Sequence, residues 1–185
     1  MNIKSSTFLA VLTVLSLGLL IFRAQGGKSM PVVTQSPNAE VSVPVRPTAA
    51  DLALQPKVEK TEADWKTQLT PDQFKIMRGQ ATERAGSSPL LSEHRRGVFH
   101  CAGCGAPLFS SDSKFESGTG WPSFNKPFVA ANIVIAEDHS LWMSRDEVRC
   151  ARCGSHLGHV FDDGPPPTGQ RYCLNGLTLK FEPRP

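Results

Sequence analysis

Hydrophobic and polar residues divide the chain into three stretches of different character. Residues 8–22 form an uninterrupted apolar run of 15 residues without a charge. Residues 25–57 contain five prolines and no aromatic residue, which predicts an extended tether without fixed structure. From residue 58 to residue 185, short hydrophobic runs alternate with Gly, Pro, Asp and Ser, the pattern of a folded domain built from short elements.

Two helix starts open the predicted domain. Thr61 is a candidate N-cap, with Asp64 three residues further on. Thr70 is a second candidate N-cap and is followed by Pro71 at the first helical position, where a missing N–H costs nothing. We expect the helical region to end at Gly86, because glycine commonly terminates helices.

The rest of the domain has the residue pattern of short strands, rich in β-branched and aromatic residues between turn formers. The predicted strands lie within Val98–His100, Phe128–Ala136, Leu141–Met143, Val160–Phe161 and Leu174–Phe181. No helical pattern alternates with these runs, which disfavours a parallel α/β sheet. The expected fold is mainly β, with antiparallel sheets preceded by short N-terminal helices.

The apolar run of residues 8–22 is long for the core of a signal peptide and short for a membrane-spanning helix, which needs about 20 residues. A cut after Ala24 would place Phe22 where a cleavage site needs a small residue. We therefore expect residues 1–24 to be an uncleaved membrane anchor, with secretion after signal cleavage as the alternative. Either route places the domain outside the cytoplasm, in a periplasm or lumen. Positive charges flank the run on both sides and do not fix its orientation. The remaining alternative is a cytoplasmic protein whose first helix packs on another protein.

The net charge of +3 comes from the N-terminal part of the chain. Residues 1–57 have five Lys and Arg against two Asp and Glu, whereas residues 58–185 have fifteen of each sign. A formally neutral domain offers no basic surface for nucleic acid, so we expect no nucleic-acid partner. The length of 185 residues accommodates one ordinary domain and an appendage, and we expect a monomer.

Four of the five cysteines form two C-x-x-C pairs, and a glycine follows each pair. The pairs are Cys101 with Cys104 and Cys150 with Cys153. A tight turn of this kind points two thiolates to one side, so two pairs provide the tetrahedral sulfur shell that zinc prefers. Because 45 residues separate the pairs, the metal would join two distant hairpins. Iron is the alternative metal. Two disulfides or a disulfide-exchange motif are disfavoured, because such short-loop disulfides are strained and neither pair has a thioredoxin-like setting.

Cys173 is free if a metal binds the other four cysteines. Arg171 and Asn175 lie two positions before and after it, so on a strand the three side chains share one face. A cation beside a thiol favours the thiolate. His156 and His159 are three residues apart, a spacing that places them on one side of a turn. Together these residues have the composition of a nucleophilic site, and the alternative is that Cys173 is a buried core residue.

A glycine-rich loop precedes Trp121. Gly118 and Gly120 bracket Thr119, and the loop then continues to Trp121 and Phe124. A large aromatic side chain on such a loop suits the wall of a pocket for a small apolar group. The alternative, equally compatible with the spacing, is that Trp121 and Phe124 fill the core.

Three long motifs resemble those of the B-type methionine sulfoxide reductases. They are Lys114–Phe124 with its Gly-Trp-Pro-Ser-Phe end, His156–Pro165 and Arg171–Asn175, and both cysteine pairs occur in the expected order. The similarity covers about residues 65–182. The resemblance implies a β-rich fold stabilised by one structural zinc ion on the four paired cysteines. It also implies repair of oxidised proteins through reduction of the R epimer of methionine sulfoxide.

The resemblance also assigns a role to each residue around the free thiol. The Cys173 thiolate would attack the sulfoxide sulfur and become a sulfenic acid. His159 would be the proton source, with His156 beside it. Arg171 would support the thiolate, and Asn175 would hold the sulfoxide oxygen or its water.

The substrate-binding residues implied by the resemblance are Trp121, which would receive the methyl group, and Phe124. Thr119 stands where many relatives have a second, resolving cysteine, so we expect an external thiol such as thioredoxin, glutathione or another small dithiol to reduce the sulfenic acid. Residues 85–92 lack the aromatic side chains usual there, which changes one pocket edge. The competing hypotheses are a zinc-stabilised binding module without chemistry and a peroxidase-like or disulfide-exchange role for Cys173.

Overall fold

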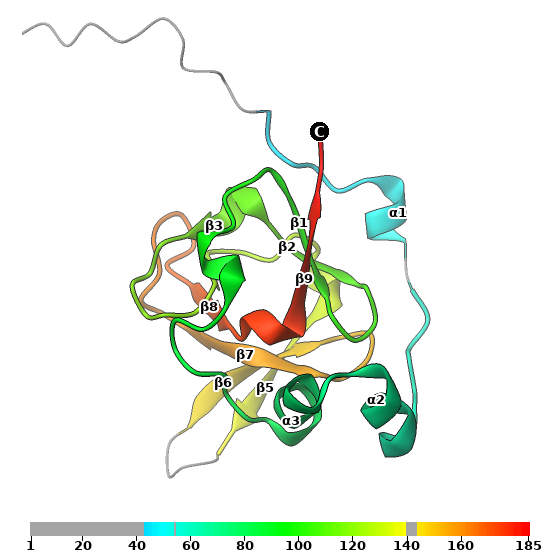
Figure 1. Ribbon diagram of the computed structural model, residues 1–185. Helices are drawn as coiled ribbons and strands as arrows, with labels where there is room; N and C mark the ends of the chain where they lie inside the picture. Colours follow the sequence, from blue (N-terminus) through cyan, green and yellow to red (C-terminus); the bar gives the residue numbers. More distant parts are fainter. Residues whose placement is uncertain (1–42, 54, 140–143) are drawn as a thin grey trace, which may run out of the picture. The chain divides into compact units, whose positions relative to one another are not determined.

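Two antiparallel sheets form the body of the domain (Figure 1). The computed structural model describes residues 43–53, 55–139 and 144–185. The strands are β1 Gly97–Cys101, β2 Pro107–Ser110, β3 Lys114–Phe115, β4 Ser123–Phe124, β5 Ile133–Asp138, β6 Arg145–Cys150, β7 His156–Phe161, β8 Arg171–Leu174 and β9 Leu179–Pro183. The smaller sheet has the order β2-β1-β9 and the larger one β3-β4-β8-β7-β6-β5. The expected mainly β, antiparallel fold class is confirmed.

The helices are α1 Ala49–Leu52, α2 Glu62–Gln68 and α3 Pro71–Gly79. Both predicted helix starts are confirmed. The Thr61 hydroxyl accepts from the backbone N–H of Asp64, whose carboxylate accepts from Thr61 in return. Thr70 forms the same reciprocal arrangement with Gln73, and a proline follows it.

The predicted helix end at Gly86 is wrong, because α3 stops at Gly79. Gln80 follows in the left-handed conformation, with φ of 55°, and its N–H donates to the carbonyl of Lys75. The Gln80 side chain then donates to the carboxylate of Glu147 on β6. A tertiary contact therefore terminates the helix earlier than the glycine would.

The predicted strands agree with the observed ones to different degrees. Val98–His100 lies within β1 and Val160–Phe161 within β7. The run Phe128–Ala136 begins irregularly, and β5 starts only at its sixth residue. Leu174–Phe181 is divided between the end of β8, a 3₁₀ turn and β9. The run Leu141–Met143 lies outside the described residues.

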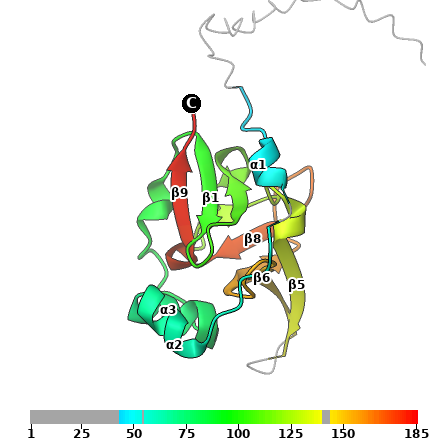
Figure 2. The ribbon, with the colours of Figure 1, turned by 90° about the vertical axis from the view of Figure 1, so that its right-hand side faces the viewer.

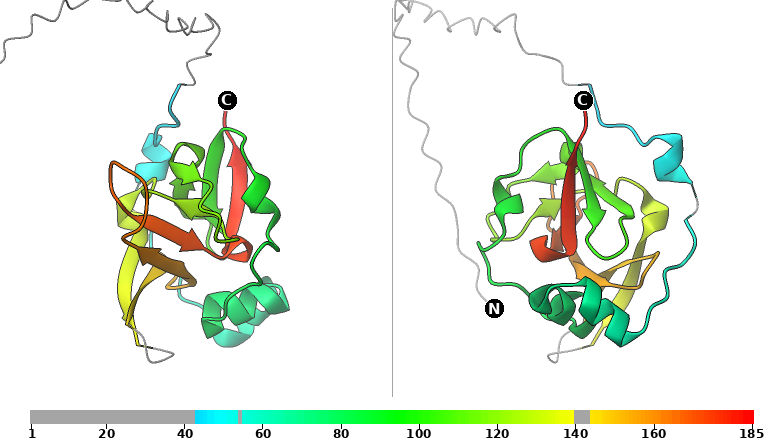
Figure 3. Two further views of the ribbon diagram at one scale, coloured as in Figure 1. Left: turned by 90° about the vertical axis from the view of Figure 1, so that its left-hand side faces the viewer. Right: turned by 45° about the vertical axis from the view of Figure 1, so that its right-hand side comes forward.

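The core lies between the two sheets and beneath the helices. Figure 2 shows β1 and β9 side by side with β8 crossing below them, while α2 and α3 lie together at one end of the domain. Phe99 and Phe109 meet Phe124 at the centre, with ring centroids 4.9 and 4.7 Å apart. Trp65 from α2 and Met77 from α3 are buried and close the core from the helical side. Figure 3 shows the long strand β5 at the outer edge of the larger sheet.

The described residues before Val58 differ from the structureless linker that we expect from their composition. Arg96 donates to the carbonyl of Val43, and Val45 donates to Asp112. Asp51 in α1 accepts two hydrogen bonds from Arg184, at 2.7 and 2.8 Å. Prolines favour an extended chain but do not show whether it lies on a surface, so these long-range pairs could not be read from composition.

No helix among residues 43–53, 55–139 and 144–185 has the length and hydrophobicity required to cross a membrane. The apolar run of residues 8–22, on which we base the expected anchor, lies outside the described residues.

Candidate active site and metal centre

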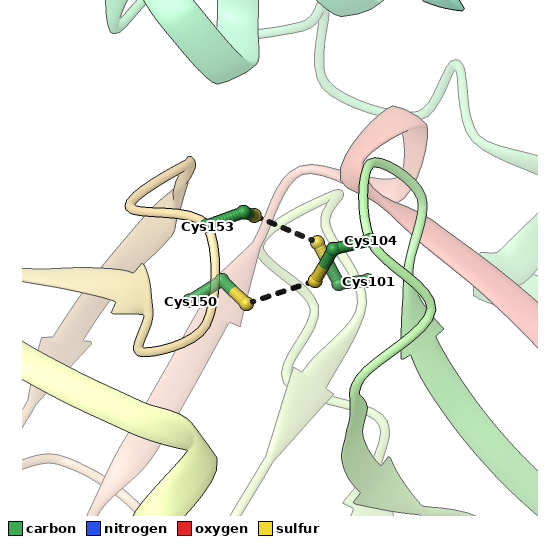
Figure 4. Close-up of side chains that lie close together, drawn as sticks. All are labelled: Cys101, Cys104, Cys150 and Cys153. Atoms are coloured by element: carbon green, nitrogen blue, oxygen red, sulfur yellow. Dashed lines mark hydrogen bonds between the residues drawn. The ribbon is translucent and has the colours of Figure 1, made fainter. Parts of the chain in front are cut away.

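The four paired cysteines converge at the ends of two hairpins, one from each sheet. Cys101 and Cys104 flank the turn after β1, and Cys150 and Cys153 flank the turn after β6 (Figure 4). The glycine after each pair has a positive φ, 77° at Gly105 and 69° at Gly154, as the sequence predicts. We call these two turns with their cysteines the cysteine knuckles.

The sulfur geometry of the knuckles fits a four-coordinate metal. All four sulfurs lie within 4.8 Å of one another, with 3.7 Å between Cys101 and Cys153 and 3.5 Å between Cys104 and Cys150. A tetrahedron of metal–sulfur bonds of ~2.3 Å would separate its sulfurs by about 3.8 Å. None of the four forms a disulfide, and three of them are buried. The two distant pairs therefore form one candidate metal site, as their spacing predicts.

Cys173 lies on the central strand β8 of the larger sheet, away from these pairs in the strand order. It pairs with Ser123 of β4 on one side and with His159 of β7 on the other. Its half-buried side chain lines a cavity of about 140 Å³, together with Trp121, His159 and Asn175. Four of the predicted site residues are therefore brought together around one small pocket.

Arg171 supports this pocket from the side. Its guanidinium donates two hydrogen bonds of 2.8 Å to Asp163 and stacks on the Phe161 ring, 4.4 Å from the ring centroid. These bonds lower the pKa of Asp163 below its ordinary value. They also raise the pKa of Arg171, to which the neighbouring Cys173 sulfur contributes. Asp163 thus fixes a permanent positive charge beside the nucleophile candidate.

Each histidine of the predicted pair lies against a carboxylate. His159 Nε2 is 2.8 Å from Asp138 Oδ2, and His156 Nδ1 is 2.7 Å from Glu147 Oε1. Their rings contact edge to face at 5.4 Å. His156 is only 3% exposed and does not line the cavity; burial lowers its pKa, although the bond to Glu147 opposes that shift. His156 is therefore a neutral support behind His159, with its Nδ1–H directed at the carboxylate.

Phe124 does not occupy the predicted position in the substrate pocket. Its side chain is fully buried, at 0% exposed, and packs against Phe99 and Phe109 in the core. The alternative that the sequence left open, core packing, holds for this residue. Trp121 is half-exposed and lines the cavity, and its indole N–H donates to the backbone carbonyl of Glu83 at 3.2 Å.

Hydroxyl groups surround the Cys173 sulfur on the glycine-rich loop. Thr119 Oγ1 is 3.8 Å from Cys173 Sγ and 2.9 Å from Ser117 Oγ, which is 2.8 Å from Ser123 Oγ. Gly120 has a φ of 92°, and a Cβ there would approach Ala85 to 2.9 Å. A glycine at position 120 therefore lets the loop bring Thr119 next to the sulfur.

Residues 69–183 match the model of the SelR domain. A peptide methionine sulfoxide reductase MsrB from Methanosarcina mazei is 55% identical over 127 residues, which cover 69% of this chain and 91% of the relative. The protein of that name from Agrobacterium fabrum is 51% identical over 128 residues, 69% of this chain and 95% of the relative. The chain belongs to the SelR family. It is accordingly an oxidoreductase that acts on methionine sulfoxide, which confirms the family resemblance and the enzyme class.

Family membership leaves several acidic residues of this site that the sequence analysis did not identify. They are Glu83, Asp138, Glu147 and Asp163. Asp163 stands inside a motif already singled out, so its spacing from Arg171 was a usable signal. Glu147 lies in a run of charged residues that has the composition of a solvated face, although it is only 1% exposed. Nothing in the local sequence distinguishes it.

Proposed function

We propose that this SelR-family enzyme reduces the R epimer of methionine sulfoxide in proteins, with Cys173 as its nucleophile. The observation that carries the proposal is the cavity in which the Cys173 sulfur meets the Trp121 ring and the polar side chains of His159 and Asn175. A sulfoxide has one polar oxygen and one apolar methyl group, so a pocket with one polar and one aromatic wall suits it. Exchanging oxygen and methyl, as in the S epimer, would place each group against the wrong wall.

The first step forms a bond between Cys173 and the sulfoxide oxygen. The thiolate attacks the sulfoxide sulfur, the oxygen takes up one proton, and methionine leaves while Cys173 becomes a sulfenic acid. His159, oriented by its bond to Asp138, is the proton donor in this scheme. Arg171, held by Asp163, stabilises the thiolate before attack.

An external thiol completes the cycle. It condenses with the Cys173 sulfenic acid to a mixed disulfide with loss of water, and a second thiol then releases Cys173 and leaves as a disulfide. Residue 119 is close enough to resolve a sulfenic acid, since its Oγ1 lies 3.8 Å from Cys173 Sγ, but it is a threonine. This substitution supports a single-cysteine cycle with thioredoxin or a small thiol as reductant.

The cysteine knuckles would hold zinc in a structural role. Four thiolates complete its tetrahedral shell and leave no position open for substrate or water, so the ion would stabilise the fold and take no part in the reaction. The site joins β1 of the smaller sheet to β6 of the larger one.

Steady-state turnover of the purified full chain tests the proposed activity. Peptides containing the pure R or the pure S epimer are supplied with dithiothreitol, and methionine is measured by mass. We expect reduction of the R epimer alone. Turnover of the S epimer at the same rate would contradict the pocket assignment, and a zinc-stabilised binding module would reduce neither.

For localisation, residues 8–22 support an anchor that leaves the domain outside the cytoplasm. Mass spectrometry of the mature N-terminus, with fractionation of the producing cells, tests this part. An intact N-terminus in the membrane fraction is expected. A soluble chain that begins after residue 24 would instead indicate secretion.

A further inference from the structure

Glu83 is a buried carboxylate beside the active-site cavity to which neither the sequence motifs nor the proposed mechanism gives a role. It is 7% exposed, and no Lys, Arg or His within the described ranges forms an ion pair with it. Burying an unpaired charge is costly unless hydrogen bonds satisfy it. Its carboxylate accepts the backbone N–H groups of Gly176 at 2.5 Å and Leu177 at 3.1 Å. Both donors belong to the turn directly after the β8 strand that carries Cys173.

The backbone of Glu83 contacts two proposed substrate-binding residues as well. Its N–H donates to Asn175 Oδ1 at 2.9 Å, and its carbonyl accepts the indole N–H of Trp121 at 3.2 Å. The polar and the aromatic walls of the cavity therefore meet at one residue, which lies 92 positions from Asn175 and 38 from Trp121 in the chain.

These contacts determine which way the Asn175 amide faces. Its Oδ1 accepts from Glu83, and its Nδ2 donates to the carbonyl of Leu157 at 3.1 Å. An amide nitrogen has two hydrogens, so one N–H remains available to an oxygen in the cavity. If the turn at Gly176 moved, Asn175 would move with it, because the two residues are adjacent.

Close packing leaves the turn little freedom to shift while the carboxylate holds it. A Cβ on Gly176 would approach Ser88 Oγ to 1.9 Å and Glu83 Oε1 to 3.4 Å. The loop that contains Glu83 and Ser88 therefore lies directly against the turn, and the carboxylate is the group that hydrogen-bonds across this contact.

We propose that Glu83 is a positioning residue, whose carboxylate fixes the Gly176–Leu177 turn so that the Asn175 amide presents its free N–H to the sulfoxide oxygen. The inference rests on the proposed function for the role of Asn175. Glu83 does not contact the reacting atoms and acts through its neighbour.

The variant Glu83→Gln tests this proposal with little change in side-chain shape. An amide can accept only one of the two backbone N–H groups and turns its own NH₂ toward the other donor. We expect kcat/KM for the R epimer to fall by about 10- to 100-fold, the range that a displacement of ~1 Å can cause. The control Glu59→Gln changes an exposed glutamate and should leave kcat/KM unchanged. Zinc content and far-UV circular dichroism show whether each variant is folded.

A double-mutant cycle separates positioning from general damage to the fold. If Glu83 acts through Asn175, adding Glu83→Gln to Asn175→Ala lowers kcat/KM less than about 2-fold further. Multiplying losses would overturn the proposal, as would wild-type activity of Glu83→Gln or of Asn175→Ala. Absence of R-epimer reduction by the wild-type chain would instead contradict the proposed function.

A second variant keeps the proposal testable if Glu83→Gln does not fold. Leu177→Pro removes one N–H donor to the carboxylate and leaves Glu83 itself in place. We expect a loss of about 3- to 10-fold in kcat/KM that is also absorbed in the Asn175→Ala background. Full activity of this folded variant would overturn the proposal.

Discussion

The cysteine knuckles and the Cys173 pocket place the same side chain in two different settings. In the knuckles, tight turns bring four sulfurs within 4.8 Å of one another, and three of the four cysteines are buried. Cys173 lies on a strand, half-buried, beside the Thr119 hydroxyl and the Arg171 guanidinium. A thiol surrounded by thiols is a metal ligand, whereas a thiol beside a fixed cation and an open cavity is a nucleophile. Neighbouring groups, and not the cysteine itself, determine the chemistry.

The largest expected effect comes from removing the nucleophile alone. Cys173→Ser should lower turnover by at least about 10⁴-fold, because a hydroxyl at neutral pH is a far weaker nucleophile than a thiolate. The knuckles are untouched, so zinc measured by atomic emission should remain at about one ion per chain. Residual reduction of the sulfoxide at the wild-type rate would contradict the separation of the two settings.

Removing one knuckle sulfur should damage the fold before the chemistry. Structural zinc contributes about 10–16 kcal/mol in small zinc domains, comparable with the entire stability of about 5–15 kcal/mol of an ordinary domain. Cys101→Ser should therefore lose zinc and its cooperative thermal transition together, as measured by metal analysis and circular dichroism. A folded, metal-free and fully active Cys101→Ser variant would show that the knuckles are dispensable.

A smaller change would give the Cys173 pocket a second sulfur. In Thr119→Cys the new thiol would replace an oxygen that lies 3.8 Å from Cys173 Sγ, on a loop with glycines on both sides. An intramolecular disulfide should form after a single turnover and appear as a loss of two hydrogens in the intact mass. Preference for a dithiol over a monothiol reductant should rise by about 10-fold.

Thr119→Ser is the matched control, because it keeps the hydroxyl and adds no sulfur. Unchanged reductant preference in Thr119→Cys would count against the single-cysteine cycle.

The smallest expected effect is a pH dependence of stability on the pocket side. Burial lowers the pKa of His156, so the unfolded chain binds its proton more readily than the folded one. The stability contributed by neutral His156 is complete above the unfolded value of about 6.5 and is lost as the pH falls toward the lower folded value. Between pH 7 and 5.5 we expect Tm to fall by about 2–4 °C more than in His156→Asn.

His139→Asn is the control for this comparison, since His139 is exposed. Zinc content is measured at each pH, so that metal loss from the knuckles is not mistaken for titration of His156. Identical pH slopes in the wild type and His156→Asn would contradict the assignment.

Local chemistry explains what could be predicted from the sequence. The caps at Thr61 and Thr70 involve residues three positions apart, and each knuckle is one turn with its own glycine. The pocket around Cys173 was predicted from motifs whose residues lie close together on β7 and β8. In each case the residues that define the feature are near one another in the chain.

Contacts between distant residues explain what was missed. The strand β6 was not predicted, because its Arg-Asp-Glu-Val-Arg run has low strand propensity, yet Glu147 is buried against His156 of the next strand. Asp51 meets Arg184 across 133 residues, and Glu83 meets Leu177 across 94. A carboxylate that functions through such a partner has the same local sequence as one that faces solvent.

Trapping of the sulfenic acid tests the central claim most directly. The full chain, loaded with zinc, is mixed with one equivalent of an R-epimer sulfoxide peptide and dimedone in the absence of any thiol, and adducts are located by peptide mass spectrometry. The account predicts one adduct, on Cys173, with the zinc retained and one methionine released per chain. Adducts on the knuckle cysteines with loss of zinc, or methionine released without any modification of Cys173, would contradict it.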